Sequence, residues 1–314
     1  MRIVFCGTPA FAVPSLRHLL AQRDCEVLAV LTQPDRPRGR GHEVAESAVK
    51  RAAVAAGIAV HQPEKVRAPE VQQLLERLAP DAVVIIAYGQ IIPARLLPIP
   101  KFGWINLHAS LLPKYRGAAP INWAIANGET ATGVTSMRID AGMDTGDMLL
   151  RREVTIGEDE TAPELAARLA DLGAPLISET LRGLAAGTLQ SEAQDNSAAT
   201  YAPILKREDG RIDWNMPASQ VYNRMRGFTP WPGAFTTFRG EICHFWGEPV
   251  SNTEREKTAA GSPGTLTHAS GAVWVACGDS TALRVTSLKL EGRKQVSAAE
   301  FVNGARLKAD DRFV

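Results

Sequence analysis

The sequence predicts an α/β protein with a mainly parallel, doubly wound sheet in its first half and a small β-barrel or sandwich in its last third. In the first half, short apolar runs alternate with segments in which leucine, valine or alanine recurs at helical spacing. Residues 82–87 are apolar at every position, as expected for a parallel strand covered on both faces. Beyond residue 217, short apolar runs alternate with glycine-containing turns, which is typical of small barrels and sandwiches.

The elements of the first half follow from these patterns in order. Pro69 suits the first turn of one helix, and Gly57 ends another. Ligands of such sheets bind at the carboxyl ends of the strands, so the segments after the strands are where a site is expected. Strands are expected at residues 2–6, 26–32, 82–87, 104–108 and 133–139, and helices at residues 14–22, 45–56, 69–78 and 118–126.

The chain length and a loss of periodicity predict the domain boundaries. A chain of 314 residues is expected to form about two domains. Residues 165–184 carry a leucine-rich helical stripe, after which residues 188–208 turn polar and aperiodic. We therefore expect an α/β domain over residues 1–188, a linker over residues 189–208 and a β-rich domain over residues 209–314.

The bulk composition argues against several classes of protein. The chain has 35 basic and 34 acidic residues, so its net charge is +1 and any contact with a polyanion must come from a local patch. No apolar run approaches the roughly 18 to 20 residues that span a membrane, and the N-terminus lacks a secretory signal, so we expect a cytoplasmic protein. The four cysteines form no C-x-x-C pair and no zinc spacing with histidine, which predicts reduced thiols and no metal site.

The segment NLHASLLP, residues 106–113, places an amide and an imidazole two positions apart at the end of an expected strand. Side chains two apart on a strand point to the same face, so we expect Asn106 and His108 to share a site. A lone histidine is more often structural, and it is the company of Asn106 that favours a functional interpretation. An amide and a charged imidazole can together hold an oxyanion, as acyl transfer to an amine requires.

The segment DAGMDTGD, residues 140–147, offers an acid to this histidine. Asp144 lies between two glycines, whose backbone freedom allows a close approach to the strand end. A carboxylate beside a histidine orients the ring and favours its charged form. Asp140 and Asp147 compete for the same role, and the sequence does not rank the three acids.

Three other kinds of site lack the residues that they need. Gly7 and Gly39 follow expected strands without the G-x-G-x-x-G spacing of a dinucleotide-binding loop. Ser110 lacks the G-x-S-x-G turn of a serine hydrolase. Residues 140–147 are acidic but lack the twelve-residue length and closing glutamate of a calcium-binding loop.

The segment PDRPRGRG, residues 34–41, is a local basic patch that contains Arg36, Arg38 and Arg40. One interpretation is a solvated loop. The other is an arm that contacts phosphates, because arginines two positions apart and stiffened by proline can engage a nucleic-acid backbone. The patch follows the second expected strand, which places it at the same sheet edge as the amide and the imidazole.

The segment FTPWPGA, residues 228–234, combines aromatic residues with proline. Trp231 could stack on a nucleic-acid base. A tryptophan in such a segment more often fills a domain core, so we expect Trp231 in a domain core.

Together these segments resemble the methionyl-tRNA formyltransferase family over essentially the whole chain. Asn-x-His followed by an aspartate is shared by the wider group of 10-formyltetrahydrofolate enzymes, so it indicates the chemistry and not the acceptor. The arginine-rich segment and the C-terminal domain indicate the acceptor. The matching segments are residues 32–41, 106–113, 115–125, 140–147, 211–214 and 230–234.

The resemblance implies a Rossmann-like formyltransferase domain and an OB-like, tRNA-binding C-terminal domain. It implies 10-formyltetrahydrofolate as co-substrate and initiator methionyl-tRNA as substrate, and it calls for no metal, membrane or protein partner. It implies that Asn106, His108 and Asp144 are catalytic, and that Arg40 is the leading tRNA contact among the three arginines of its segment. The folate-contacting segment that it implies is Ser110, Leu111, Leu112 and Pro113.

Two other functions fit part of the sequence. A related formyltransferase could act on a small amine, such as glycinamide ribonucleotide or an amino sugar, but it would not need the arginine-rich segment and the C-terminal domain together. A non-catalytic RNA-binding protein could use the arginines and a barrel. Such a protein would have no use for Asn106, His108 and Asp144 in combination.

Overall fold

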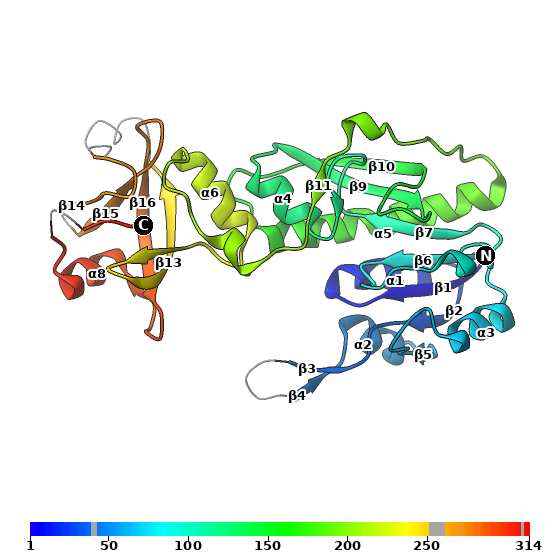
Figure 1. The fold of residues 1–314 in the computed structure, drawn as a ribbon. Coiled ribbons are helices and arrows are strands. Elements are labelled where there is room, and N and C mark those ends of the chain that lie inside the picture. The colour runs from blue at the N-terminus through cyan, green and yellow to red at the C-terminus, as the bar shows by residue number, and fades with distance from the viewer. Residues whose placement is uncertain (39–42, 251–260, 270, 309–310) are drawn as a thin grey trace. The chain divides into compact units, whose positions relative to one another are not determined.

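A computed structural model describes the chain apart from residues 39–42, 251–260, 270 and 309–310 (Figure 1). The chain divides into two compact units, each with its own sheet and its own hydrophobic core. Unit 1 comprises residues 1–120, 131–155 and 164–202. Unit 2 comprises residues 121–130, 156–163 and 203–314.

Unit 1 is built on a seven-stranded sheet in the order β10-β9-β7-β6-β1-β2-β5 (Figure 1). The strands from β7 to β5 pair in parallel, and β9 pairs antiparallel with β7 and with β10. This confirms the predicted mainly parallel α/β sheet, although β10 was not predicted because its centre is exposed and charged. The strands are β1 (Arg2–Gly7), β2 (Glu26–Leu31), β5 (Val60–His61), β6 (Ala82–Ile86), β7 (Trp104–His108), β9 (Ala131–Arg138) and β10 (Met148–Thr155).

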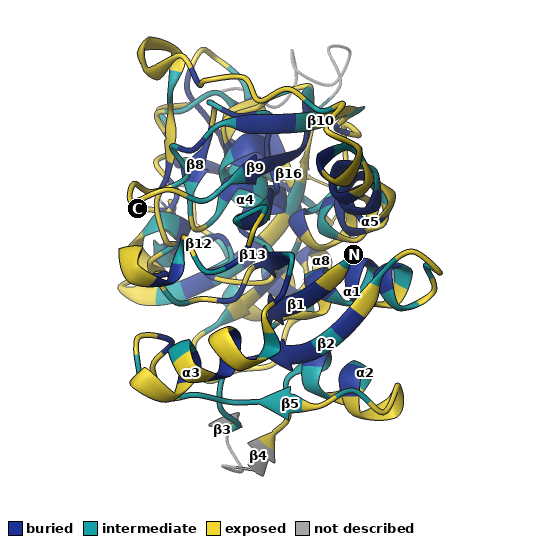
Figure 2. Ribbon diagram, turned by 90° about the vertical axis from the view of Figure 1, so that its right-hand side faces the viewer, coloured by how far each residue is buried: buried dark blue, intermediate teal, exposed yellow. Residues whose placement is uncertain are grey.

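The helices of unit 1 follow their sequence signals. The α2 helix begins where the Ser47 hydroxyl accepts a hydrogen bond from the Lys50 N–H at 3.0 Å. The α3 helix buries Val71, Leu74 and Leu75, and each such burial stabilises the fold by about 1.5–3 kcal/mol. Figure 2 shows β1 and β2 largely buried and the outer face of α3 exposed. The helices are α1 (Val13–Leu20), α2 (Ala48–Ala55), α3 (Pro69–Leu78) and α5 (Ala162–Ala186), with 3-10 turns η1 (Ala10–Ala12), η2 (Ala94–Leu96) and η3 (Asn196–Ala198).

Two small ladders complete unit 1. In the arginine-rich segment, β3 (Arg36–Arg38) pairs antiparallel with β4 (Glu43–Ala45), so the segment forms a hairpin. Elsewhere, β8 (Arg116–Gly117) pairs in parallel with β11 (Tyr201–Ala202). The second ladder joins residues that follow α5 to the segment that follows β7.

Unit 2 is built on a six-stranded antiparallel sheet in the order β12-β13-β16-β15-β14, with β17 paired to β16. The C-terminal tail joins the sheet's two edges, because Phe313 pairs with Phe238 on β12 and Arg312 pairs with Thr265 beside β14. The predicted β-rich C-terminal domain is thus confirmed. Its elements are β12 (Phe235–Phe238), β13 (Glu241–Pro249), β14 (Leu266–Ala269), β15 (Ala272–Ala276), β16 (Ala282–Leu290), β17 (Val296–Ser297), α4 (Pro120–Ala126), η4 (Arg207–Gly210), α6 (Ala218–Gly227) and α8 (Ala298–Ala305).

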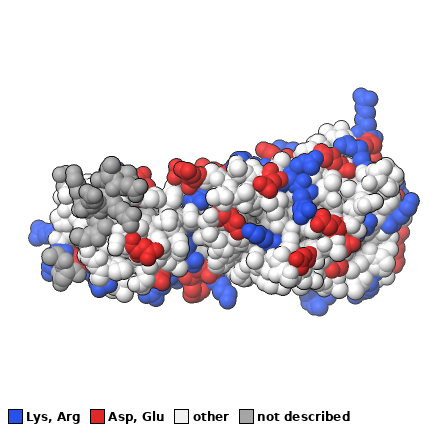
Figure 3. Space-filling model, turned by 90° about the horizontal axis from the view of Figure 1, so that it is seen from above, with Lys and Arg blue, Asp and Glu red and all other residues white. Residues whose placement is uncertain are grey.

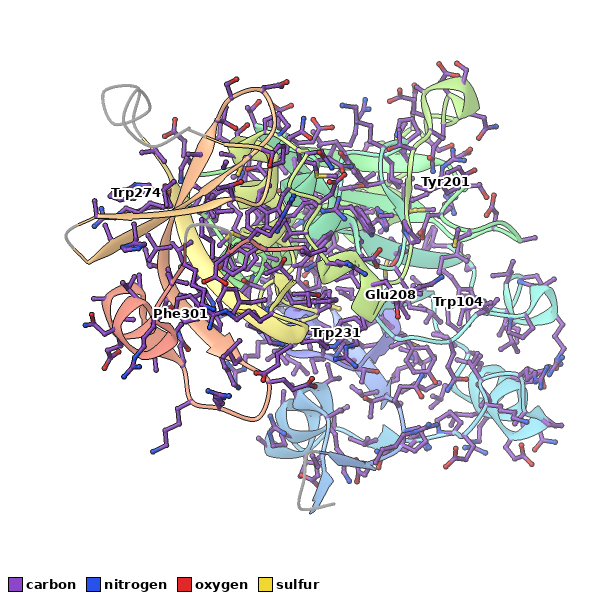
Figure 4. The ribbon with its side chains drawn as sticks, turned by 60° about the vertical axis from the view of Figure 1, so that its left-hand side comes forward. Trp104, Tyr201, Glu208, Trp231, Trp274 and Phe301 are labelled. Carbon is purple, nitrogen blue, oxygen red and sulfur yellow. The ribbon has the colours of Figure 1, made fainter. Side chains whose placement is uncertain are left out.

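Trp214 lies at the centre of the unit 2 core. Its ring centroid is 5.1 Å from that of Phe245 and 5.5 Å from that of Phe313, and its indole N–H donates to the Thr236 hydroxyl at 2.9 Å. The prediction that Trp231 fills a domain core is wrong, because Trp231 is 55% exposed in the loop between α6 and β12 (Figure 4). The interior is already occupied by the other aromatic side chains, and the loop carries Trp231 to the surface.

The surface agrees with the balanced composition. Figure 3 shows Lys and Arg interspersed with Asp and Glu on the face that it presents, without one large field of a single sign. Within the described residues, no helix is long and apolar enough to cross a membrane.

Candidate active site

The β7 strand delivers an amide and an imidazole to one face of the sheet. Asn106 is half-buried and His108 is only 5% exposed, and their alternation along the strand directs both to the same side. Between them, Leu107 points to the opposite face, where a side chain at Gly173 of α5 would overlap it. The buried strand therefore fixes the direction of the two polar side chains.

Two groups hold the His108 ring. Its Nε2 lies 2.8 Å from the backbone carbonyl oxygen of Tyr115, and its Nδ1 lies 3.7 Å from Oδ2 of Asp144. A carbonyl oxygen only accepts, so Nε2 must carry a hydrogen. Nδ1 can then donate only when the ring is doubly protonated, and the facing carboxylate stabilises that positive ring.

Asp144 is the acid that contacts His108. Its Oδ2 accepts a hydrogen bond from the Gly117 N–H at 2.9 Å, and its backbone has a φ of +55°, in the left-handed region. Asp140 instead closes its own loop, since its carboxylate accepts from the Gly142 N–H at 3.0 Å and the Thr145 hydroxyl at 2.8 Å. The structure therefore places Asp144, and not Asp140, beside His108.

The segment after His108 is held against β9. The Thr135 hydroxyl donates to the Ser110 carbonyl at 2.7 Å and accepts from the Leu112 N–H at 3.2 Å. The side chains of Ser110 and Leu112 are buried, whereas Leu111 and Pro113 are half-buried. Of the four residues expected to contact folate, these last two have side-chain surface left for a ligand.

The Asn106 amide can form hydrogen bonds with a bound polar group. Within the described part of the chain, its side chain makes no hydrogen bond to another protein group. Because it is half-buried beside His108, its N–H donors and the Nδ1 of the ring form a donor pair suited to a carbonyl oxygen that gains negative charge. These residues therefore fit a bound formyl donor.

Sequence reasoning missed several residues of this site. The Tyr115 carbonyl and the Gly117 N–H are backbone groups, so the residue types do not reveal their contacts. The glycine at position 117 is the one hint in the sequence, because it allows an unusual backbone conformation. Gln194 donates to the backbone carbonyls of Asp144 and Gly146, but it lies in a polar stretch remote in sequence from the acid loop. Only the fold brings these groups together.

The arginine hairpin is described in part. Arg36 is exposed and lies 3.7 Å from Glu64 in an exposed ion pair. Arg38 lies in β3, but its side chain falls outside the described part of the chain, as does the whole of Arg40. At the base of the hairpin, Asp35 bonds the Lys50 ammonium group, and this bond lowers the pKa of the Asp35 carboxyl.

The cysteines and acids of the described residues offer no alternative chemistry. The four cysteines are free thiols, and burial raises the pKa of Cys25 to about 11 and that of Cys243 and Cys277 to about 12. These thiols are protonated at neutral pH and are poor nucleophiles. Over the part of the chain described, no three His, Cys, Asp or Glu side chains gather as a metal site would require.

Family models define the class of protein. A formyl transferase model matches residues 1–181, and a model of the formyl transferase C-terminal domain matches residues 204–306. Together they cover most of the chain, including β7 and the acid loop. The chain is therefore a member of the formyl transferases, and its close relatives narrow the class further.

Full-length relatives give the particular family. A methionyl-tRNA formyltransferase of Solibacter usitatus is 54% identical over 314 residues, covering all of this chain and 98% of the relative. One from Geobacter metallireducens is 51% identical with the same coverage, and one from Caldanaerobacter subterraneus subsp. tengcongensis is 48% identical over 97% of each chain. The chain belongs to the methionyl-tRNA formyltransferase family, which confirms the resemblance seen in its sequence.

Solved structures support the fold alone. A sugar 3N-formyl transferase, solved in the presence of dTDP and 5-N-formyl-THF, superposes with a TM-score of 0.65 at 17% identity, covering 94% of this chain and 99% of that one. The N-formyltransferase of Helicobacter canadensis gives a TM-score of 0.63 at 18% identity, covering 90% and 98%.

Proposed function

We propose that Asn106, His108 and Asp144 carry out the transfer of a formyl group from 10-formyltetrahydrofolate to the α-amino group of methionine on tRNA. One observation carries this assignment. His108 Nε2 donates to the Tyr115 carbonyl, and its Nδ1 lies 3.7 Å from the Asp144 carboxylate, while the amide of Asn106 on the same strand face has no hydrogen-bond partner within the described residues. Such a site can stabilise a carbonyl oxygen as its carbon becomes tetrahedral.

The acceptor needs little activation. An α-amino group has a pKa of about 7.7 to 8.0, so a useful fraction is neutral near pH 7. A bond forms between the amine nitrogen and the formyl carbon while the formyl oxygen gains negative charge. The bond from that carbon to N10 of the folate then breaks, and a water molecule carries a proton from the amine to N10.

The protein acts on the negative oxygen. The Asn106 Nδ2 and the His108 Nδ1 donate hydrogen bonds to it, and the Tyr115 carbonyl keeps the ring turned so that Nδ1 is available. Asp144 stabilises the doubly protonated ring from 3.7 Å. Losing one such donor slows an acyl-transfer step by about 10² to 10³.

The folate contact is formed by loops at the carboxyl ends of the strands. Leu111 and Pro113, from the segment Ser110 to Pro113, present half-buried surface there. Two exposed apolar side chains lie in other loops of unit 1: Ile91 follows β6, and Met143 immediately precedes Asp144. Apolar surface beside a few polar groups is what a flat heterocycle needs for binding.

The tRNA contact uses the arginine hairpin together with the C-terminal domain. Arg36, Arg38 and Arg40 supply the positive charge that phosphates attract, and the β-rich domain over residues 209–314 adds a second nucleic-acid surface. The physiological substrate is initiator methionyl-tRNA, and the reaction takes place in the cytoplasm. Residues 1–188 form the catalytic domain, and residues 189–208 lead from it to the C-terminal domain, with residues 189–202 packed in unit 1.

A small-amine acceptor is the rival function, and a solved sugar 3N-formyl transferase shares the fold. The full-length relatives near 50% identity are methionyl-tRNA formyltransferases, which favours tRNA. The test is an acceptor screen with a labelled formyl donor. Labelled product is expected with methionyl-tRNA and not with glycinamide ribonucleotide or an amino sugar. Label in a small amine with none in tRNA would reject the proposal.

A further inference from the structure

A segment after α5 returns to the catalytic edge of unit 1. This segment, residues 192–202, is here termed the strap. Its Glu192 exchanges two backbone hydrogen bonds with Met148, both 2.8 Å long, and its β11 strand pairs with β8. The Thr200 hydroxyl accepts a hydrogen bond from the Tyr115 N–H at 2.9 Å. The strap therefore touches both loops that orient His108, the one after β7 and the one that carries Asp144.

Gln194 of the strap lies at the centre of these contacts and is almost fully buried. Its side-chain N–H groups donate to the Asp144 carbonyl at 2.8 Å and to the Gly146 carbonyl at 2.7 Å. Its amide oxygen accepts from Nε and Nη2 of Arg116 at 3.0 and 2.8 Å. Nη2 of Arg116 also donates to the Asn196 side-chain oxygen at 2.9 Å.

The arrangement needs an amide at residue 194. A guanidinium only donates, so Arg116 fixes which end of the Gln194 amide is the oxygen. The nitrogen end is then directed at the two carbonyls of the acid loop. A glutamate could accept from Arg116 but could not donate to the carbonyls, and a methionine could do neither. Arg116 is only 2% exposed, so these bonds form away from water, where each one matters most.

The same residues set the position of the Asp144 carboxylate. Asp144 has a φ of +55°, in the left-handed region that aspartate adopts less readily than glycine, so contacts that hold the loop help to keep this conformation. Gln194 binds the carbonyl of Asp144 itself and that of Gly146 two residues on. The neighbours of Arg116 complete the arrangement, because the Gly117 N–H binds the Asp144 carboxylate and the Tyr115 carbonyl binds His108.

We propose that Gln194, oriented by Arg116, is a positioning residue for the formyl-transfer step, holding the acid loop so that the Asp144 carboxylate faces Nδ1 of His108. The proposal rests on the proposed function, in which Asp144 supports the charged ring. The strap, within the stretch expected from sequence to be a linker, is on this account part of the catalytic machinery.

The test measures kcat and KM for both substrates in Gln194→Glu, Asp144→Asn and the double variant. Gln194→Glu should lower kcat about 10- to 100-fold with both KM values within about threefold, because a small misplacement of a reacting group can cost about 10² in rate. In the Asp144→Asn background, Gln194→Glu should lower kcat less than about threefold further, because both substitutions remove the same support of the His108 ring. The control Gln73→Glu makes the same charge change at an exposed position of α3 and should leave kcat unchanged.

The outcomes are distinguishable. If Asp144→Asn keeps full kcat, the proposed function fails and this proposal fails with it. If Asp144→Asn is slow but Gln194→Glu keeps full kcat, or if the two losses multiply in full, only the proposal for Gln194 is overturned. Gln194→Met repeats the test if the glutamate variant does not fold. Failure of both variants to bind tetrahydrofolate would assign Gln194 a structural role and also overturn the proposal.

Discussion

The site around His108 and the arginine hairpin both follow strands of one mainly parallel sheet, yet they are built in opposite ways. His108 is 5% exposed, with Nε2 hydrogen-bonded to the Tyr115 carbonyl and Nδ1 3.7 Å from the Asp144 carboxylate, whereas the Arg36 side chain is 69% exposed and its partner Glu64 is exposed as well. A transition-state contact gains from fixed donors away from water, and a phosphate contact works through charge at the surface. The first region should therefore control kcat, and the second should control the KM for tRNA.

The largest effect should come from removing a donor to the formyl oxygen. Asn106→Ala should lower kcat by about 10² to 10³ while tetrahydrofolate binding stays within a few-fold, because the amide acts on the charge that develops in the transition state. Steady-state kinetics with saturating methionyl-tRNA, together with a tetrahydrofolate titration, measures both. A near-normal kcat would remove Asn106 from the mechanism.

A smaller loss of kcat should follow from shifting the backbone donor to Asp144. Gly117 has a φ of +120°, and a side chain there would approach the Ala202 carbonyl oxygen to 2.6 Å, so Gly117→Ala must move the β8–β11 ladder. We expect kcat to fall about tenfold. The matched control is Gly57→Ala, which also has a positive φ but open space around it, and its kcat should be unchanged. Equal losses in the two variants would mean that only the backbone strain matters.

The hairpin should show the opposite pattern. Arg36→Ala should raise the KM for methionyl-tRNA several-fold with kcat unchanged, and it should reduce the slope of log KM against log salt by about 1, because one phosphate contact is lost. Glu64→Gln removes the competing acid and keeps Arg36, so its KM should be unchanged or lower. A lower kcat without a change in KM in Arg36→Ala would break the comparison between the two regions.

The smallest effect on activity should come from unit 2. The hydrogen bond from Arg239 lowers the pKa of the Asp311 carboxyl, with an Nε to Oδ1 distance of 2.8 Å. Asp311→Asn should lower the free energy of unfolding by about 1 kcal/mol near neutral pH, since the Arg239 side chain is 43% exposed and screened by water. The kcat at saturating substrate should not change.

The sign of the pH dependence follows from the lowered pKa. The stabilisation is complete above the carboxyl's ordinary pKa of 3.8 and is lost as the pH falls through the lower value in the folded protein. Urea unfolding of wild type and Asp311→Asn over this range should show the difference shrinking towards acid. A difference that is constant with pH would show that the ion pair is not its cause.

The sequence could predict the parts of this protein that depend on local pattern. The β7 strand and the α3 helix begin and end at the expected residues, and Asn106 and His108 lie on one strand as their motif predicts. Short or exposed elements gave weaker signals. The α8 helix was not predicted, although Ser297 and Glu300 form the reciprocal hydrogen bonds of a capping box at its start.

Contacts between residues far apart in the chain, and contacts of backbone atoms, could not be predicted from the sequence. The choice of Asp144 over Asp140 depends on loop geometry, and the Gln194 contact joins residues far apart in the chain. Trp231 was placed wrongly because the sequence does not show that Trp214 and its aromatic neighbours already fill the core. Such facts depend on which side chains compete for the same space, and local patterns do not record that competition.

The central claim is that two donors from β7 bind the formyl oxygen while Asp144 supports the ring. The most direct test is a crystal structure with a chemically stable analogue of 10-formyltetrahydrofolate. The account predicts the formyl oxygen within hydrogen-bond reach, about 3 Å, of Asn106 Nδ2 and His108 Nδ1, with Asp144 still beside the ring. A formyl group directed away from both side chains, or an Asp144 carboxylate turned away from His108, would contradict it.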